Sequence, residues 1–324
     1  MKKTLLAVAI PALLFANASS AVELYNDAAN TFSIGGHVAM GLAGSDEGET
    51  QVASVSPRIN FEATRDLGEG YTMFLRTEWS VNTLDGGANS FSTRLGYLGL
   101  SHADNGTAII GTQWSPYYSV GGVADLPVAF ANGSLYSDHY NLGTGRAERM
   151  VSYSNKLDLG TAGALKLGLG WQGKHAAYDT RVQAALTYSV MDVTLGYAHN
   201  TGDVAADKAV SNIVSAKYGS YGNGLYAAVS YADNEFMNNA LAETSQTSAI
   251  AAYALPSSVN LSVNYETVEN DLTNKTLNES TAFQVEYKPF NNVLTYVGYQ
   301  VDLGDDDATT ADDNKWALGA RLYL

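Results

Sequence analysis

Three stretches of the sequence place an arginine among apolar residues that otherwise read as strand. Arg58 lies in "SPRINFEA", Arg76 in "MFLRTEW" and Arg94 in "STRLGYLGLSH". A full charge that faces an apolar core costs several kcal/mol unless it is paired. The pattern therefore predicts that the apolar and the charged sides of these strands face different media. The chemistry such arginines offer in a wet medium is electrostatic action on ions.

One dipeptide suggests catalysis instead. An Asp-His pair can activate water, and Asp138-His139 stands in "LYSDHYN". The five histidines are scattered, however, and neither HxxxH nor a serine motif for an acyl enzyme is present. We therefore interpret Asp138-His139 as a loop dipeptide and predict no catalytic residue and no enzyme.

No cofactor or metal site is predicted either. "GLGLG" around Gly168 has no following helix, so it is not a phosphate loop. The acidic stretches "SDEGE" and "LGDDDATTADD" read as surface loops that share divalent ions loosely with lipopolysaccharide. A formal charge of −15 argues against nucleic acid as a partner, because that affinity rests on cationic groups.

The first residues read as a secretory signal peptide. Lys2 and Lys3 precede an apolar run, and Ser19-Ser20-Ala21 is a small-residue cleavage pattern. We expect residues 1–21 to be removed, which leaves residues 22–324 as one domain with a charge of −17. No later apolar run approaches the ~20 residues that a membrane helix needs. The chain has no cysteine.

Period-two alternation dominates the rest of the chain and predicts an all-β fold. In "NLSVNYE", for example, Leu261, Val263 and Tyr265 share one face, opposite Asn260 and Ser262. Four further stretches alternate in the same way: residues 181–188, 193–199, 282–288 and 293–301. A soluble sandwich would bury these apolar faces, whereas an outer-membrane barrel turns them to lipid.

Three features favour the transmembrane antiparallel β-barrel. The polar faces carry almost no large aliphatic residues. Tyrosines recur along the apolar stripe as an interfacial girdle would: Tyr188, Tyr197, Tyr218, Tyr231, Tyr253, Tyr265, Tyr287 and Tyr299. Seven tight connections alternate with eight long ones, near Asp46, Gly86, Ser115 to Arg146, His175, Gly202, Asn238, Asn274 and Asp306. This predicts about 16 strands, enough to enclose an aqueous channel.

A barrel explains the arginines. Ile59 and Phe61 alternate with Arg58 and would face lipid, where an arginine near the midplane costs ~2–4 kcal/mol. Arg58, Arg76 and Arg94 therefore belong to the lumen. In the fourth strand the alternation places Leu98 and Leu100 on the face of Arg94, which fits less well.

The mature chain as a whole resembles the trimeric general diffusion porins of Gram-negative outer membranes. The resemblance rests on "VELYN", "SPRINFEAT", "STRLGYLGL" and "GTQWSPYYSVGGVADLP", followed by "GR" before "MVSYSN". It implies a long third loop folded into the lumen, a basic cluster on the wall that faces an acidic group on this loop, and a homotrimer in outer-membrane lipid. It also implies passive diffusion of ions and small hydrophilic solutes.

Matched motif by motif, the resemblance gives Arg58, Arg94 and Arg146 as wall arginines and Asp125 as the loop carboxylate. His37 falls where the family often has a lumen lysine, and Arg76 is added from alternation alone. The sequence departs from the family at "PVAF", residues 127–130, where some members have a second acidic residue. It departs again at Leu324, where the family usually ends in phenylalanine.

Three functions remain open from the sequence. The leading hypothesis is a non-specific pore. A ligand-selective channel for sugars or anions would use an aromatic path, and Tyr117, Tyr118, Tyr136 and Tyr140 keep that alternative open. An outer-membrane hydrolase is the third.

Overall fold

The computed structural model describes residues 21–87, 90–238, 241–304 and 313–324 of the chain. The predicted signal peptide, except Ala21, lies outside the described residues. The strands are β1 (Val22–Asn26), β2 (Asn30–Ser45), β3 (Gln51–Ala53), β4 (Arg58–Gly68), β5 (Tyr71–Val81), β6 (Phe91–His102), β7 (Gly106–Trp114), β8 (Arg146–Asp158), β9 (Ala164–Gln172), β10 (Tyr178–Val190), β11 (Val193–Val204), β12 (Asp207–Ser220), β13 (Asn223–Asn238), β14 (Leu241–Ala254), β15 (Val259–Asn270), β16 (Lys275–Phe290), β17 (Val293–Asp302) and β18 (Lys315–Tyr323).

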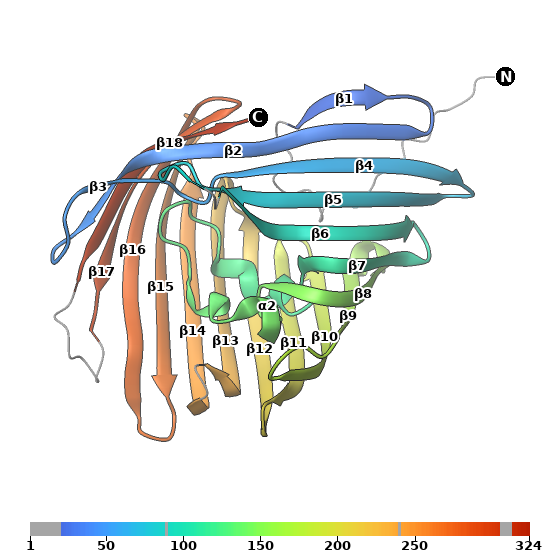
Figure 1. Cartoon of the computed structure of the whole chain (residues 1–324). Coiled ribbons are helices and arrows are strands. Elements are labelled where there is room, and N and C mark those ends of the chain that lie inside the picture. Colours follow the sequence, from blue (N-terminus) through green and yellow to red (C-terminus); the bar gives the residue numbers. More distant parts are fainter. Residues whose placement is uncertain (1–20, 88–89, 239–240, 305–312) are drawn as a thin grey trace.

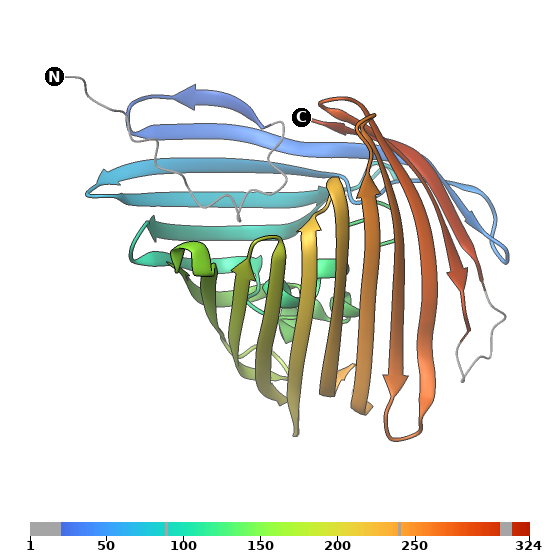
Figure 2. The ribbon, with the colours of Figure 1, turned by 180° about the vertical axis from the view of Figure 1, so that it is seen from behind.

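These strands form one closed antiparallel barrel. Each strand from β4 onward pairs with the next, and β18 returns to pair with β2, which also pairs with β4. The sheet has 18 strands, of which the short β1 and β3 both lie along β2, so sixteen strands make the wall. The predicted strand number is confirmed. In Figures 1 and 2 the strands on opposite walls run at a steep angle to each other.

The first and last strands lie in line along β2. Tyr323 of β18 is opposite His37, and Val22 of β1 is opposite Ile34 of the same strand. The backbone N–H of Leu324 also donates to the Gly36 carbonyl at 3.0 Å. β1 thus continues β18 along an edge of β2 that would otherwise be unpaired, which leaves fewer free backbone groups at the seam.

The two rims of the barrel differ less than the sequence suggested. The seven tight connections are present, among them residues 69–70, 191–192 and 291–292. Three connections predicted to be long, near His175, Gly202 and Asn274, are short, at residues 173–177, 205–206 and 271–274. The polar segments that were expected to be loops instead extend the strands. Pairing with the neighbouring strand satisfies their backbone N–H and C=O groups. The predicted loops near Asn238 and Asp306 centre on residues outside the described part.

The burial pattern is the reverse of that of a soluble protein. Phe283 and Val297 are 54% and 50% exposed, whereas Gln284 and Glu286 are 3% and 6% exposed. Six of the predicted girdle tyrosines are also exposed: Tyr197, Tyr218, Tyr231, Tyr253, Tyr287 and Tyr299. The apolar faces therefore point outward and the polar faces inward, as a membrane barrel requires.

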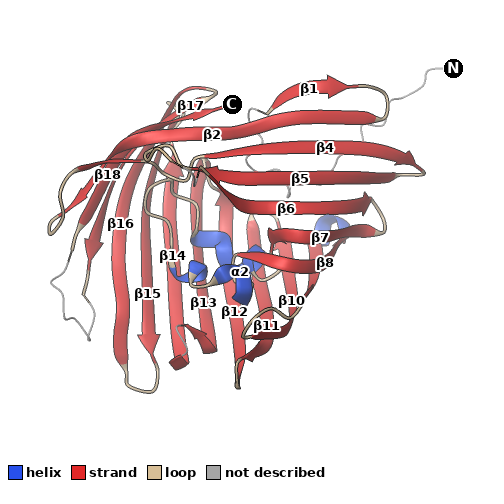
Figure 3. Cartoon of the chain, viewed as in Figure 1, coloured by secondary structure: helices blue, strands red, loops and turns tan. Residues whose placement is uncertain are grey.

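Most of the helical structure lies between β7 and β8, in residues 115–145, which we call the third loop. It contains α1 (Tyr118–Gly121), η2 (Gly122–Ala124), η3 (Ser134–Tyr136) and α2 (His139–Leu142); η4 (Gly160–Ala162) lies in a tight turn (Figure 3). No helix in the described residues is long and apolar enough to cross a membrane.

Candidate functional site

Side-chain amides on three consecutive strands hold the end of the third loop to the inner wall. Gln172 of β9 donates to the Tyr140 carbonyl at 2.6 Å, and Gln183 of β10 donates to that of Gly143 at 2.8 Å. Asn200 of β11 donates to the Leu142 carbonyl at 2.8 Å. The loop therefore lies against inward-facing side chains, which accords with the predicted loop inside the barrel.

Two buried carboxylates hold the middle of the loop to the facing wall. The Val128 N–H donates to Glu286 Oε1 at 3.0 Å, and the Ser134 N–H donates to Glu266 Oε1 at 3.1 Å. Hydrogen bonds to charged groups stabilise by roughly 1.5–3 kcal/mol each. The loop is thus bonded both to β9–β11 and to β15 and β16, which fixes its position along the inner wall.

Removing both anchors should loosen the third loop. In a Glu266→Ala, Glu286→Ala double variant, we expect a larger mean single-channel conductance and stronger current fluctuations, because the backbone donors of the loop lose their acceptors. Planar-bilayer recordings measure both quantities.

The matched control is Glu279→Ala. The Glu279 carboxylate accepts a hydrogen bond from the Tyr265 hydroxyl at 2.7 Å and, among the described residues, bonds to no residue of the third loop. Wild-type currents from the double variant would contradict the anchoring role of the two carboxylates.

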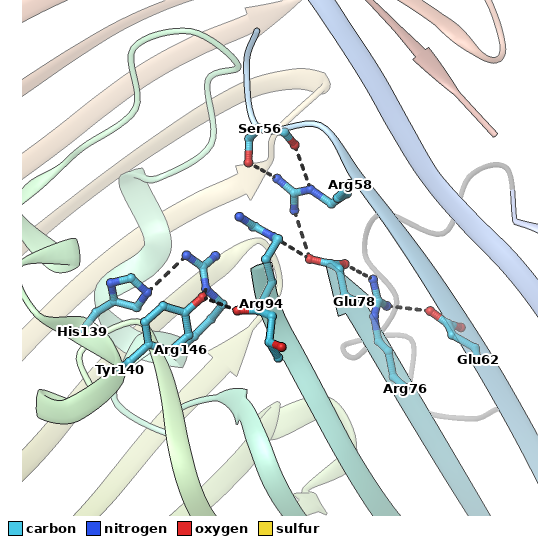
Figure 4. Close-up of polar contacts among 10 residues, drawn as sticks. Ser56, Arg58, Glu62, Arg76, Glu78, Arg94, His139, Tyr140 and Arg146 are labelled. Carbon is cyan, nitrogen blue, oxygen red and sulfur yellow. Dashed lines mark hydrogen bonds and ion pairs between the residues drawn. The ribbon is translucent and has the colours of Figure 1, made fainter. Parts of the chain in front are cut away.

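Glu78 of β5 is the centre of a charged network on the inner wall. Its carboxylate lies 2.8 Å from Arg76 Nη2, 2.8 Å from Arg94 Nε and 3.6 Å from Arg58 Nη1. Arg76 Nη1 also pairs with Glu62 Oε1 at 2.6 Å (Figure 4). Three predicted wall arginines are thus brought together, but two carboxylates neutralise much of their charge.

A β-bulge directs Arg94 into this network. Glu78 is opposite Leu95, and Trp79 is opposite Thr93, so Arg94 has no direct partner on β5. The extra residue shifts the alternation of β6. Leu98 is consequently 44% exposed on the outer face. The expectation that Leu98 and Leu100 share the face of Arg94 was wrong for this reason.

Arg146, the first residue of β8, lies apart from the network. Its guanidinium is 5.1–5.6 Å from the ring centroids of Trp114, Tyr136 and Tyr140. Its Nε donates to the Tyr140 hydroxyl at 3.1 Å. Cation–π contacts with two loop tyrosines therefore tie this wall charge to the third loop.

Asp138 and His139 do not form a catalytic pair. Arginine can only donate, so the 3.2 Å contact from Arg146 Nη2 makes His139 Nε2 an acceptor. The His139 Nδ1–H then donates to the Tyr136 carbonyl at 3.1 Å. Burial lowers the pKa of His139, which favours the neutral ring. Asp138 accepts from the Tyr178 hydroxyl and from Asn141 instead.

Asp125, the predicted loop carboxylate, is held by tyrosines. The Tyr118 hydroxyl donates to Asp125 Oδ2 at 2.7 Å, and the Tyr136 hydroxyl donates to the same oxygen. Burial raises the pKa of Asp125, while these hydroxyls and Arg146 oppose that rise. Tyr136 contacts both Asp125 and Arg146, so one ring fixes a loop anion and a wall cation.

His37 of β2 is opposite Arg58 in register, so it lies next to the predicted wall cluster. It is 6% exposed, and its Nε2 has no hydrogen-bond partner among the described residues. A buried nitrogen without a partner is unusual, and the imidazole ring instead packs edge-on against Tyr323, with the ring centroids 5.6 Å apart.

The sequence reasoning missed both carboxylates of the network. Glu78 lies two residues after Arg76, and Glu62 lies four after Arg58, so alternation already places them on the lumen face. The same rule that identified Arg76 could have found them. The arrangement as a whole presents fixed, opposed charges at close range, which can orient water and repel apolar solutes.

Comparison with known proteins gives one consistent family. The family model described as Gram-negative porin matches residues 4–323. Outer membrane protein S2 of Salmonella typhi is 28% identical, over 95% of this chain and 94% of that protein.

Two solved structures share the fold. Salmonella typhi OmpF in complex with daunomycin has a TM-score of 0.79 at 19% identity, covering 94% of this chain and 100% of that one. OmpT of Vibrio cholerae, described as a trimer form, has a TM-score of 0.71 at 18% identity, covering 91% and 100%.

Proposed function

Because this chain belongs to the Gram-negative porin family, we propose that it forms a water-filled channel for passive diffusion of ions and small hydrophilic solutes. The protein is an outer-membrane porin. We further propose that residues 1–21 direct its export and are removed.

The observation that carries this function is the charged network on the inner wall. Glu78 is 2% exposed and Arg94 is also largely covered, yet both lie inside a barrel whose outer face is apolar. Several charges on one inner wall are tolerated where water fills the space between the walls. A filled apolar core would impose a desolvation cost of several kcal/mol on each ion, even on a paired one.

We assign the constriction to the predicted residues and to two more. Arg58, Arg76 and Arg94 would act with Glu62 and Glu78 as one wall, beside His37. Asp125 and Arg146 would act from the third loop and its junction with β8. Their opposed charges would orient dipolar solutes on passage.

The ligand-selective alternative receives less support. An aromatic path for sugars needs exposed rings, but Tyr117 is fully buried and bonded to Ser211 at 2.7 Å. The hydroxyls of Tyr118 and Tyr136 are engaged by Asp125. The engagement of His139 by Arg146 likewise argues against a hydrolase.

We propose a homotrimer in lipid and lipopolysaccharide as the working assembly. The related fold described as a trimer form in Vibrio cholerae supports this number. An exposed apolar outer wall offers the surface for both lipid and neighbouring copies.

Planar-bilayer recording of the purified protein tests the function. We expect an ohmic, water-filled conductance that inserts in unitary events and closes in three equal steps. Small sugars and amino acids should pass in liposome-swelling assays without saturation.

A membrane that stays non-conducting, although the protein remains folded, would refute the channel. Saturable passage of a single solute would favour the ligand-selective alternative. Mass measurement in detergent that gives monomer alone would refute the trimer.

A further inference from the structure

Two lysines face the barrel interior near the short-turn rim, away from the charged network. Lys166 of β9 alternates with Leu167 and Leu169, which are 40% and 43% exposed on the outer face. Gly168, the next inward position, lies against Pro116 of the third loop, since a Cβ there would be 3.2 Å from Pro116 Cβ. Lys166 therefore points into the interior, just beyond the point where the loop enters.

Lys156 of β8 is the direct cross-strand partner of Lys166. Directly paired residues have Cβ atoms ~4.5–5.5 Å apart on one face, and like charges at this spacing are destabilising. Neither ammonium group forms an ion pair with any residue that the structure describes. The wall thus carries two adjacent positive charges without a compensating carboxylate.

A further hydrogen-bond donor lies beside the lysine pair. Thr187 of β10 is directly opposite Lys166 on its other side, so Lys156, Lys166 and Thr187 form one row across three strands. Asp158 is the acidic residue nearest in sequence on this face, but its Oδ1 accepts from the Gly160 N–H at 2.8 Å within the turn. Two ammonium groups and a hydroxyl are consequently presented together.

We propose that Lys156, Lys166 and Thr187 form a binding site for a small doubly charged oxyanion, such as phosphate or a dicarboxylate, on the short-turn side of the constriction. Two ammonium groups can each donate charge-assisted hydrogen bonds to one dianion, and the dianion removes their mutual repulsion. A monovalent anion such as chloride satisfies the pair less well. The site deepens the proposed channel function and depends on it.

Inorganic phosphate is the probe. Single-channel currents are recorded in potassium chloride at constant ionic strength, while phosphate in its doubly charged form replaces chloride on one side at a time. We expect phosphate to reduce the current at low concentration. The reduction should be stronger from the side on which it reaches the lysines without crossing the constriction.

Variants of the two lysines distinguish phosphate binding at the pair from an effect of the total positive charge in the lumen. Lys156→Gln with Lys166→Gln should raise the half-effect concentration of phosphate about tenfold or more, since charge-assisted bonds are lost. Lys156→Arg with Lys166→Arg keeps the charges and should retain the effect. The matched control is Lys217→Gln on β12, a single lysine that also forms no ion pair among the described residues.

Clear outcomes overturn the proposal. An equal phosphate effect in the glutamine variant, or no effect in a wild-type channel that conducts chloride normally, would exclude the site. Failure to conduct chloride would instead contradict the channel function itself. An effect lost equally in Lys217→Gln would mean that total lumen charge, not the pair, governs phosphate.

Discussion

Glu78→Gln is expected to shift the channel toward anions more than any other single substitution in the wall. Three arginines and two glutamates give the network a net charge of +1, which this change raises to +2. It also releases Arg58 and Arg94 from their shared acceptor. One added charge at ~6 Å from a permeant ion contributes about 0.7 kcal/mol in a water-like dielectric. The charge destabilises a cation and stabilises an anion by this same amount, so the cation-to-anion permeability ratio should fall roughly tenfold, as measured by reversal potential in a salt gradient.

Glu62→Gln makes a useful comparison because it removes the same charge. Glu62 contacts Arg76 alone in this network, so Arg58 and Arg94 keep their partner. We expect a smaller shift than for Glu78→Gln. Glu279, among the described residues, bonds to neither the third loop nor the network, so Glu279→Gln should leave the reversal potential unchanged. If Glu62 and Glu78 variants both behave as wild type, the network does not face the permeation path.

The barrel was predictable because its signal is repeated along the chain. Stretches such as residues 260–266 and 293–301 alternate without interruption, and each lies within one strand. The rims were less predictable. Strand ends beyond the apolar band are polar, so Gly202 looked like loop although β11 continues to Val204. Only the backbone hydrogen bonds to the neighbouring strand distinguish a polar strand end from a loop.

The candidate site, too, was predictable from the sequence only where its strands are regular. Alternation alone placed Arg58 and Arg76 inside, since their strands are regular as far as Glu78. Arg94 needed the bulge, which a single sequence does not reveal. The aromatic contacts of Arg146 join β7, β8 and the third loop, and no pattern in the local sequence predicts contacts between these segments. Irregular backbone and long-range contacts thus account for what the sequence left open.

The charges of the wall and of the outer rim should act at different salt concentrations. The chain is strongly acidic overall, and acidic loops concentrate cations near the mouth. Their fields are screened over ~8–10 Å at physiological salt. Charges in a narrow constriction lie within that distance of any passing ion. The wall should therefore dominate selectivity as salt rises.

Replacing Arg58 and Arg94 together with serine should make the channel clearly cation-selective and wider. The network then holds Arg76, Glu62 and Glu78, so its net charge falls from +1 to −1. A change of two charges at ~6 Å shifts the energies of a cation and of an anion by about 1.4 kcal/mol each, in opposite directions, which is roughly a hundredfold in the permeability ratio. Loss of two long side chains should also raise the conductance. Reversal potential and single-channel conductance, each measured at low and at high salt, test both effects.

Adding Glu78→Gln to this double variant provides the decisive control. The network then keeps one arginine and one glutamate, Arg76 and Glu62, so its charge returns to zero and selectivity should move back toward neutrality. The wider pore should persist, because no long side chain is restored. Arg149→Ser, which removes an exposed arginine paired with Glu148, should change neither quantity. If the double variant leaves the reversal potential where it was, Arg58 and Arg94 do not line the constriction, and their assignment from the family resemblance is wrong.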